Sequence, residues 1–105
     1  MAVNGPAAQD KTLIIVKEDG CSYCEHAIRH VQEWQKQEEK YLAVDVVVID
    51  EEAHPDYTEK NHCYVFPSFF AGGVKLYEGI ATKEVVRQIL EIVLSGNFQP
   101  LELVK

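Results

Sequence analysis

Basic residues are scarce in this chain: ten Lys and Arg stand against seventeen Asp and Glu, which gives a formal net charge of −7. Phosphate groups attract clusters of Lys and Arg, so this balance argues against nucleic acid or an anionic membrane as a partner. No apolar segment approaches membrane-spanning length, and residues 1–6 lack the charged start and apolar run of a signal peptide. These absences predict a soluble protein that binds neither nucleic acid nor membrane.

Cysteine is also scarce, with three residues in a chain of 105. That number is too small for a secreted disulfide scaffold and favours a reducing compartment, so we expect the protein in the cytoplasm. With 47% hydrophobic residues, a chain of this length can bury about two thirds of its unfolded surface in one core. We therefore predict one domain over residues 12–96, with a flexible leader over 1–11 and a tail over 97–105.

The first half of the chain has the pattern of a βαβ unit. Residues 12–17, which contain the apolar run 13–16, are typical of a buried strand, and apolar residues then recur at helical spacing over 22–38. Residues 43–49 are dense in β-branched side chains and predict a second buried strand. A helix between two strands predicts a right-handed crossover that makes the strands parallel.

The second half predicts a short helix over 55–61 and then a hairpin. Gly72-Gly73 separates the strand-like runs 68–71 and 74–78, as expected for a two-residue turn. Pro67 cannot donate a backbone hydrogen bond, so it should lie at the start or an irregular edge of its strand.

A last helix should begin after Thr82, whose hydroxyl can cap it, and end before Gly96. Its buried stripe is predicted to be Val85, Val86, Ile89, Ile92 and Val93. Beyond it, Leu101, Leu103 and Val104 are apolar residues of the tail, for which the sequence predicts no docking place.

The segment Cys21-Ser22-Tyr23-Cys24 lies where the first strand gives way to the first helix. Residues three apart lie on one helical face, so the two sulfurs can form a reversible disulfide. The positive end of the helix dipole favours a thiolate on Cys21, whereas Glu25 at i+4 opposes it. This context favours redox chemistry.

Two alternatives to redox chemistry remain. Cys21, Cys24, His62 and Cys63 would form a four-ligand zinc site if the fold brought the distant pair close. The cysteines could also be structural. Cys63 itself is interpreted as a small, partly buried apolar residue, with regulatory oxidation as the alternative.

The predicted order β-α-β-α-β-β-α resembles the thioredoxin-fold superfamily, in its minimal glutaredoxin-like form with a mixed four-stranded sheet and three helices. The motifs that carry the resemblance are Cys21-Ser22-Tyr23-Cys24, Val65-Phe66-Pro67-Ser68, and Gly79 followed by Thr82-Lys83-Glu84. The resemblance implies a thiol-disulfide oxidoreductase in which Cys21 attacks and Cys24 resolves. It implies that Pro67 is cis and adjacent to the cysteines, and that Tyr23, Phe66, Pro67 and Gly79 contact substrate.

The motifs differ between subfamilies. Tyr23 before the second cysteine is similar to glutaredoxins, and Ile15 stands where thioredoxins usually carry a buried aspartate. The paired glycines with which glutaredoxins help to hold glutathione are reduced to Gly79.

The resemblance implies no tightly bound cofactor, with glutathione as a possible co-substrate. The expected partners of a monomeric protein are disulfide-bearing proteins or glutathione, together with a reductase as electron donor. Two alternatives of other classes stay open: a glutathione-dependent [2Fe–2S] protein that bridges two subunits through Cys21, and a noncatalytic interaction module.

Overall fold

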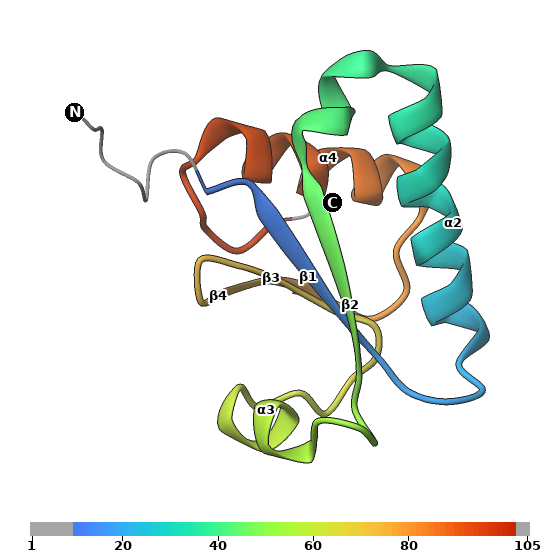
Figure 1. Ribbon diagram of the computed structural model, residues 1–105, viewed down its shortest axis with the longest axis vertical. Helices are drawn as coiled ribbons and strands as arrows, with labels where there is room; N and C mark the ends of the chain where they lie inside the picture. The colour runs from blue at the N-terminus through green and yellow to red at the C-terminus, as the bar shows by residue number, and fades with distance from the viewer. Residues whose placement is uncertain (1–9, 103–105) are drawn as a thin grey trace.

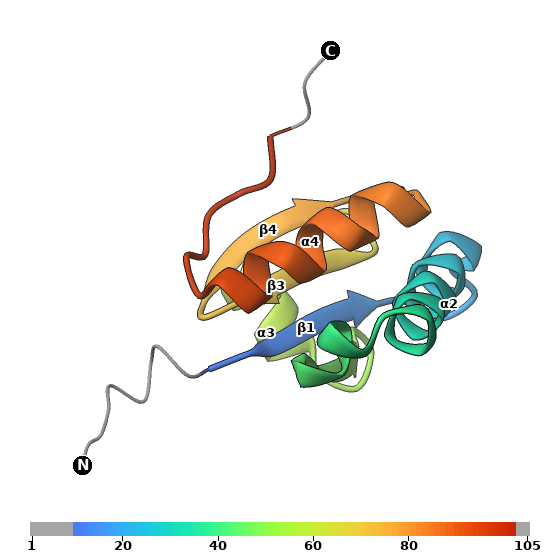
Figure 2. The ribbon, with the colours of Figure 1, turned by 90° about the horizontal axis from the view of Figure 1, so that it is seen from above.

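The computed structural model describes residues 10–102, in which a four-stranded sheet lies between helices on its two faces. α2 and α4 cover one face, and the shorter α3 lies against the other (Figure 1). Figure 2 shows α4 running along β3 and β4, and the end of β1 leading into α2. The elements in chain order are β1 (Thr12–Lys17), α2 (Ser22–Gln37), η1 (Glu39–Ala43, a 3-10 helix), β2 (Asp45–Asp50), α3 (Pro55–Lys60), β3 (Ser68–Ala71), β4 (Val74–Glu78) and α4 (Lys83–Ser95).

The sheet has the strand order β2-β1-β3-β4, and β1 is parallel to β2 but antiparallel to β3. In the register, Val16 near the end of β1 lies beside Ser68 at the start of β3, and Ser68 lies beside Glu78 at the end of β4. The predicted α/β class, the mixed four-stranded sheet and the β-α-β-α-β-β-α order are confirmed. The register brings the ends of β1 and β4 and the start of β3 to one end of the sheet.

Alternate residues of β1 point into two apolar clusters. Leu13 and Ile15 pack with the buried faces of α2 and α4 in the larger cluster. Val16 packs with Phe70 and Cys63 in a smaller cluster on the side of α3. Successive side chains of a strand point to opposite faces, so both faces of β1 are covered.

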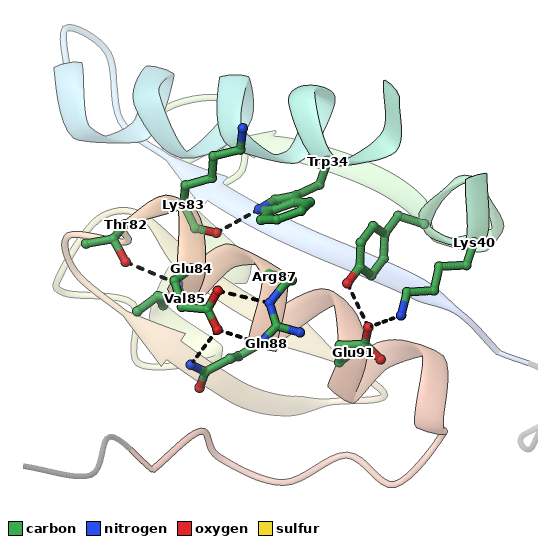
Figure 3. Close-up of polar contacts among 10 residues, drawn as sticks. Trp34, Lys40, Thr82, Lys83, Glu84, Val85, Arg87, Gln88 and Glu91 are labelled. Atoms are coloured by element: carbon green, nitrogen blue, oxygen red, sulfur yellow. Dashed lines mark hydrogen bonds and ion pairs between the residues drawn. The ribbon is translucent and has the colours of Figure 1, made fainter. Parts of the chain in front are cut away.

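Polar contacts tie α2 and η1 to α4 (Figure 3). The indole N–H of Trp34 donates to the carbonyl of Lys83 over 2.7 Å. The hydroxyl of buried Tyr41 donates to Glu91 Oε2 over 2.7 Å, and Lys40 Nζ lies 2.7 Å from the same oxygen. These contacts hold the far end of α2 against α4, so the orientation of the helix that begins at the cysteine motif is fixed along its length.

The prediction of a buried strand over 43–49 is wrong in two respects. Ala43 belongs to η1, and the strand is Asp45–Asp50. β2 is an edge strand, and its Val47 and Val48 side chains are 45% and 41% exposed. An edge strand has a neighbour on one side only. Val47 points to the face of α3, as Ile49 does, and the six-residue α3 is too short to cover the length of β2 there. Val48 points to the opposite face, which α3 does not cover.

The tail after α4 folds back on the sheet. The N–H of Leu101 donates to the carbonyl of Leu76 in β4 over 2.8 Å. Phe98 and Leu101 pack against the larger apolar cluster. Leu103, Val104 and most of the predicted leader lie outside the described residues. Within residues 10–102, no helix has the length and apolar character needed to cross a membrane.

Candidate redox site

The cysteine motif begins at the junction between β1 and α2. Gly20 has a positive φ of 76°, which suits glycine, and the chain then enters the helix with Cys21 as its N-cap. The N–H of Cys21 donates to the carbonyl of Glu18 over 3.3 Å, which closes the turn. Cys21 therefore stands at the first turn of α2, where backbone N–H groups lack helical partners.

Cys21 and Cys24 form a disulfide, with their Cα atoms 5.2 Å apart. The two sulfurs differ in their access to solvent, because Cys21 is partly exposed and Cys24 is fully buried. The N–H of Cys24 donates to Cys21 Sγ over 3.1 Å, so the outer sulfur caps the helix. A reaction partner from solution can reach Cys21, and Cys24 is positioned to react only with Cys21.

The Phe66-Pro67 peptide bond is cis, which confirms that prediction. Pro67 is buried immediately before β3, and the sheet register places it at the same end as the cysteine motif. Its carbonyl accepts a hydrogen bond from the N–H of Gly79 over 2.8 Å. Gly79 has a φ of 101° and lies beside Val65, so the segments before β3 and after β4 form one surface.

Phe66 has its side chain against the cluster on the side of α3. In the described part of the chain, neither its backbone N–H nor its carbonyl forms a hydrogen bond with another protein group. Two backbone groups at the same end of the sheet as the motif are therefore available to an external partner.

Four large apolar side chains at this end of the sheet are exposed: Tyr23 (50%), Tyr64 (73%), Val65 (44%) and Ile80 (57%). They come from α2, from the segment before β3 and from the segment after β4. We call this set the apolar rim. Of the four, the sequence interpretation selected only Tyr23. The sequence motifs at Pro67 and Gly79 were the signal that Val65 and Ile80 are close to the site.

The same end of the sheet is strongly acidic. Two of its carboxylates are paired, Asp50 with Lys17 at 3.5 Å and Glu78 with Lys75 at 3.0 Å. The backbone N–H of Glu52 and the ammonium of Lys17 lower the pKa of Asp50. Five further carboxylates form no ion pair within residues 10–102, and we call them the acidic border: Glu18, Asp19, Glu25, Glu51 and Glu52.

Cys63 is not part of this site. It is 4% exposed and packs with Val16 and Phe70 under α3, as expected for a small apolar residue. Burial raises the pKa of its thiol, so the neutral form is favoured. The predicted zinc alternative is not formed, since within residues 10–102 no three His, Cys, Asp or Glu side chains are grouped to hold a metal ion.

Solved structures of other proteins share this architecture. Oxidised thioredoxin from Plasmodium falciparum superposes with a TM-score of 0.62 at 18% identity, covering 81% of this chain and 83% of that one. Thioredoxin 1 from Thermosipho africanus gives a TM-score of 0.52 at 19% identity, covering 77% and 96%. The chain has the thioredoxin fold.

A third structure, the zinc-bound form of human ERp44, gives a TM-score of 0.57 at 14% identity; the match covers 84% of this chain and 27% of that one. No protein-family model matches the sequence, and no curated protein does. At these identities the solved structures establish the fold, so the chemistry must be argued from the residues of this chain.

Proposed function

We propose that the protein is a thiol-disulfide oxidoreductase in which Cys21 is the nucleophile and Cys24 is the resolving thiol. In the reduced protein, the Cys21 thiolate attacks a substrate disulfide, forms a mixed disulfide and releases one substrate thiolate. Cys24, as a thiolate, then attacks Cys21 Sγ, which closes the protein disulfide and releases the second substrate thiolate. The substrate gains two electrons, and an external dithiol or thiol reductant returns two electrons to the protein.

One observation carries this proposal: the solvent-accessible sulfur is also the helix N-cap. The N–H of Cys24 points at Cys21 Sγ, and the positive end of the α2 dipole lies beneath the same atom. Both favour negative charge on Cys21, as an attacking thiolate requires. Glu25 opposes this effect from the next turn, but its carboxylate is exposed and screened by water.

The segment before β3 is proposed to hold the substrate chain. The N–H and carbonyl of Phe66 can pair with an extended peptide as an added strand. Tyr23, Pro67 and Gly79 would then line the place where the substrate disulfide meets Cys21. The apolar rim extends that surface on both sides.

Glutathione fits this surface less well than a polypeptide does. It carries two carboxylates and one ammonium at neutral pH, and the acidic border opposes its net negative charge. The same mismatch counts against the glutathione-dependent [2Fe–2S] alternative, because a bridged cluster needs glutathione at this surface. We therefore infer polypeptide disulfides as substrates and a dithiol reductase as donor, with a monomer acting in a reducing compartment such as the cytoplasm.

Turnover with defined electron donors tests the proposal. The protein would be assayed with a mixed-disulfide substrate, once with NADPH and thioredoxin reductase and once with glutathione and glutathione reductase. We expect saturable turnover that Cys21→Ser abolishes and Cys63→Ser leaves unchanged. Saturable turnover with the glutathione system alone would overturn the donor assignment. No turnover with either donor, in a protein whose motif cycles between dithiol and disulfide, would favour a noncatalytic interaction module.

A further inference from the structure

We propose that the surface around Cys21 docks an extended, cationic polypeptide segment, so that preferred substrates carry Lys or Arg close to their disulfide. This inference rests on the proposed oxidoreductase function and specifies its substrate class. Three features of the described residues carry it: the apolar rim, the unpaired backbone groups of Phe66, and the acidic border.

The apolar rim gives the occupant its contact area. Tyr23, Tyr64, Val65 and Ile80 are each between 44% and 73% exposed, although much of the apolar content of this chain is buried in its core. Val65 lies beside Gly79, next to Ile80, so these two side chains belong to one surface, and Tyr64 precedes Val65 directly in the chain. A grouped set of exposed apolar side chains next to a reactive group is typical of a binding surface.

The backbone groups of Phe66 indicate the conformation of the occupant. A free N–H and a free carbonyl on one residue pair with a chain that offers the complementary carbonyl and N–H, which an extended segment does. Such a segment crosses the start of β3 and meets Cys21 at the first turn of α2.

The acidic border indicates that the occupant of this surface carries positive charge. Seven carboxylates lie at this end of the sheet, the five of the border together with Asp50 and Glu78, and only the last two are paired with lysines. Five unpaired negative charges therefore remain here, against −7 for the whole chain. Helix α3 adds Asp56, Glu59 and Lys60, which increases the negative charge by one.

The nearest basic groups on α2 and α4 do not cancel this charge. Arg29 lies two turns further along α2, and Lys83 is 3.7 Å from Glu33 on the shared side of the two helices. A second copy of this chain is a poor occupant, since it would set one acidic border against another. Charge complementarity selects a cationic segment.

Two matched substrates test the inference. Each is a symmetric disulfide dimer of a short peptide with the same apolar residues beside cysteine, flanked in one case by two lysines and in the other by two glutamates. The rate at which each peptide disulfide oxidises the reduced protein would be divided by the rate at which neutral dithiothreitol reduces the same peptide. This division removes the intrinsic reactivity of each peptide. We expect the lysine peptide to react about tenfold faster at low salt, and the ratio to fall toward one in 0.5 M salt.

Charge-neutralising variants locate the effect. In Glu18→Gln/Asp19→Asn/Glu51→Gln/Glu52→Gln the preference should fall severalfold, while Glu38→Gln/Glu39→Gln, at the far end of α2, should retain it. Glu25 is left intact because it also acts on Cys21. Ile80→Ser should slow both peptides, whereas Leu42→Ser, a change of an equally exposed residue on η1, should slow neither.

The outcomes separate the two proposals. Equal, salt-independent rates for the two peptides, with the disulfide exchange intact, would overturn the cationic-substrate inference alone. If the reduced protein exchanges with neither peptide, and dithiothreitol does not reduce the disulfide of the oxidised protein, the oxidoreductase function is overturned as well. The salt dependence of the unmodified protein gives the answer even if the fourfold variant does not fold.

Discussion

The backbone N–H of Cys24 donates to the sulfur of Cys21 over 3.1 Å, so the resolving residue helps to cap the helix with the side chain of its own partner. The contact uses the N–H of the third residue after the cap, the geometry that serine and threonine use at helix N-termini. It requires nothing from Cys24 beyond its backbone. Replacing the Cys24 side chain, although it removes the disulfide, should therefore preserve this backbone cap on the Cys21 sulfur.

This geometry predicts that Cys24→Ser traps the substrate on Cys21. Without the resolving thiol, the mixed disulfide formed by Cys21 has no internal route to release. Incubation with a disulfide peptide should give an adduct that is stable on non-reducing gels and in intact-mass spectra. The experiment would be run in a Cys63→Ser background, which excludes an adduct on the third cysteine. An equal loss of activity in Cys21→Ser and Cys24→Ser, with no adduct in the latter, would contradict the assigned roles.

Glu25→Gln should make Cys21 more acidic. The N–H of Glu25 donates to the carbonyl of Cys21 over 3.2 Å, which places its side chain one turn below the sulfur. A carboxylate at i+4 repels a thiolate as strongly as two like charges four residues apart on an exposed helix repel each other. Its removal should therefore lower the Cys21 pKa by about 0.3 pH unit. The pH profile of iodoacetamide alkylation measures it, with Glu38→Gln at the other end of α2 as control. No change would mean that the Glu25 side chain points away from the sulfur.

Sequence periodicity predicted the elements of the fold well because both helices on the main core side carry clear apolar stripes. It failed at β2, where Val47 and Val48 are exposed in an edge strand although the segment has the composition of a central one. The composition of a segment indicates how well its side chains suit a strand. Whether that strand lies at the edge of the sheet depends on how many strands follow it and on which side of the sheet they pair. The docking of Leu101 on β4 was unpredictable for the same reason, since it depends on tertiary contacts.

The redox motif was visible in the sequence because its spacing is local, and the cis bond at Pro67 was expected from the resemblance alone. The acidic border was not visible as a cluster. Glu18 and Asp19 stand beside the motif in sequence, but Glu51 and Glu52 join them only because β2 lies parallel to β1, with Asp50 beside Lys17. The parallel register thus gathers charges that are some thirty residues apart in the chain.

The contact of Glu91 with Lys40 and Tyr41 predicts a pH-dependent contribution to stability. The ammonium of Lys40 and the hydroxyl of Tyr41 lower the pKa of Glu91 from its ordinary value of 4.5. A carboxyl group with a lowered pKa in the folded state stabilises the fold above its unfolded pKa, and this stabilisation is lost as pH falls through the folded pKa.

Wild-type protein should therefore be more stable than Glu91→Gln at pH 7, and the difference should shrink below about pH 4.5. Urea unfolding at pH 7, 5, 4 and 3 measures this difference, with Glu59→Gln on α3 as the control. Tyr41→Phe keeps the carboxylate and removes one buried hydroxyl donor, which should cost about 1.5 kcal/mol. A Glu91→Gln difference that is constant with pH would show that the ionised carboxylate contributes nothing.

The hairpin glycines give a matched pair of substitutions that measures how firmly the tail is attached. Gly72 and Gly73 both have positive φ, 57° and 81°, so alanine at either should cost about 1 kcal/mol in backbone strain. They differ in their surroundings. A Cβ at Gly73 would meet nothing within 4 Å, whereas a Cβ at Gly72 would overlap the ring of Phe98, which packs on the main core.

Gly72→Ala should therefore destabilise the protein by about 1–2 kcal/mol more than Gly73→Ala does, because the Phe98 ring must leave its place. Urea unfolding of both variants, in the wild-type and Phe98→Ala backgrounds, forms a double-mutant cycle. In the Phe98→Ala background the two glycine substitutions should cost the same, since only the strain common to both remains. If Gly72→Ala and Gly73→Ala are equally costly with Phe98 present, the ring does not rest on Gly72 and the tail is not anchored through it.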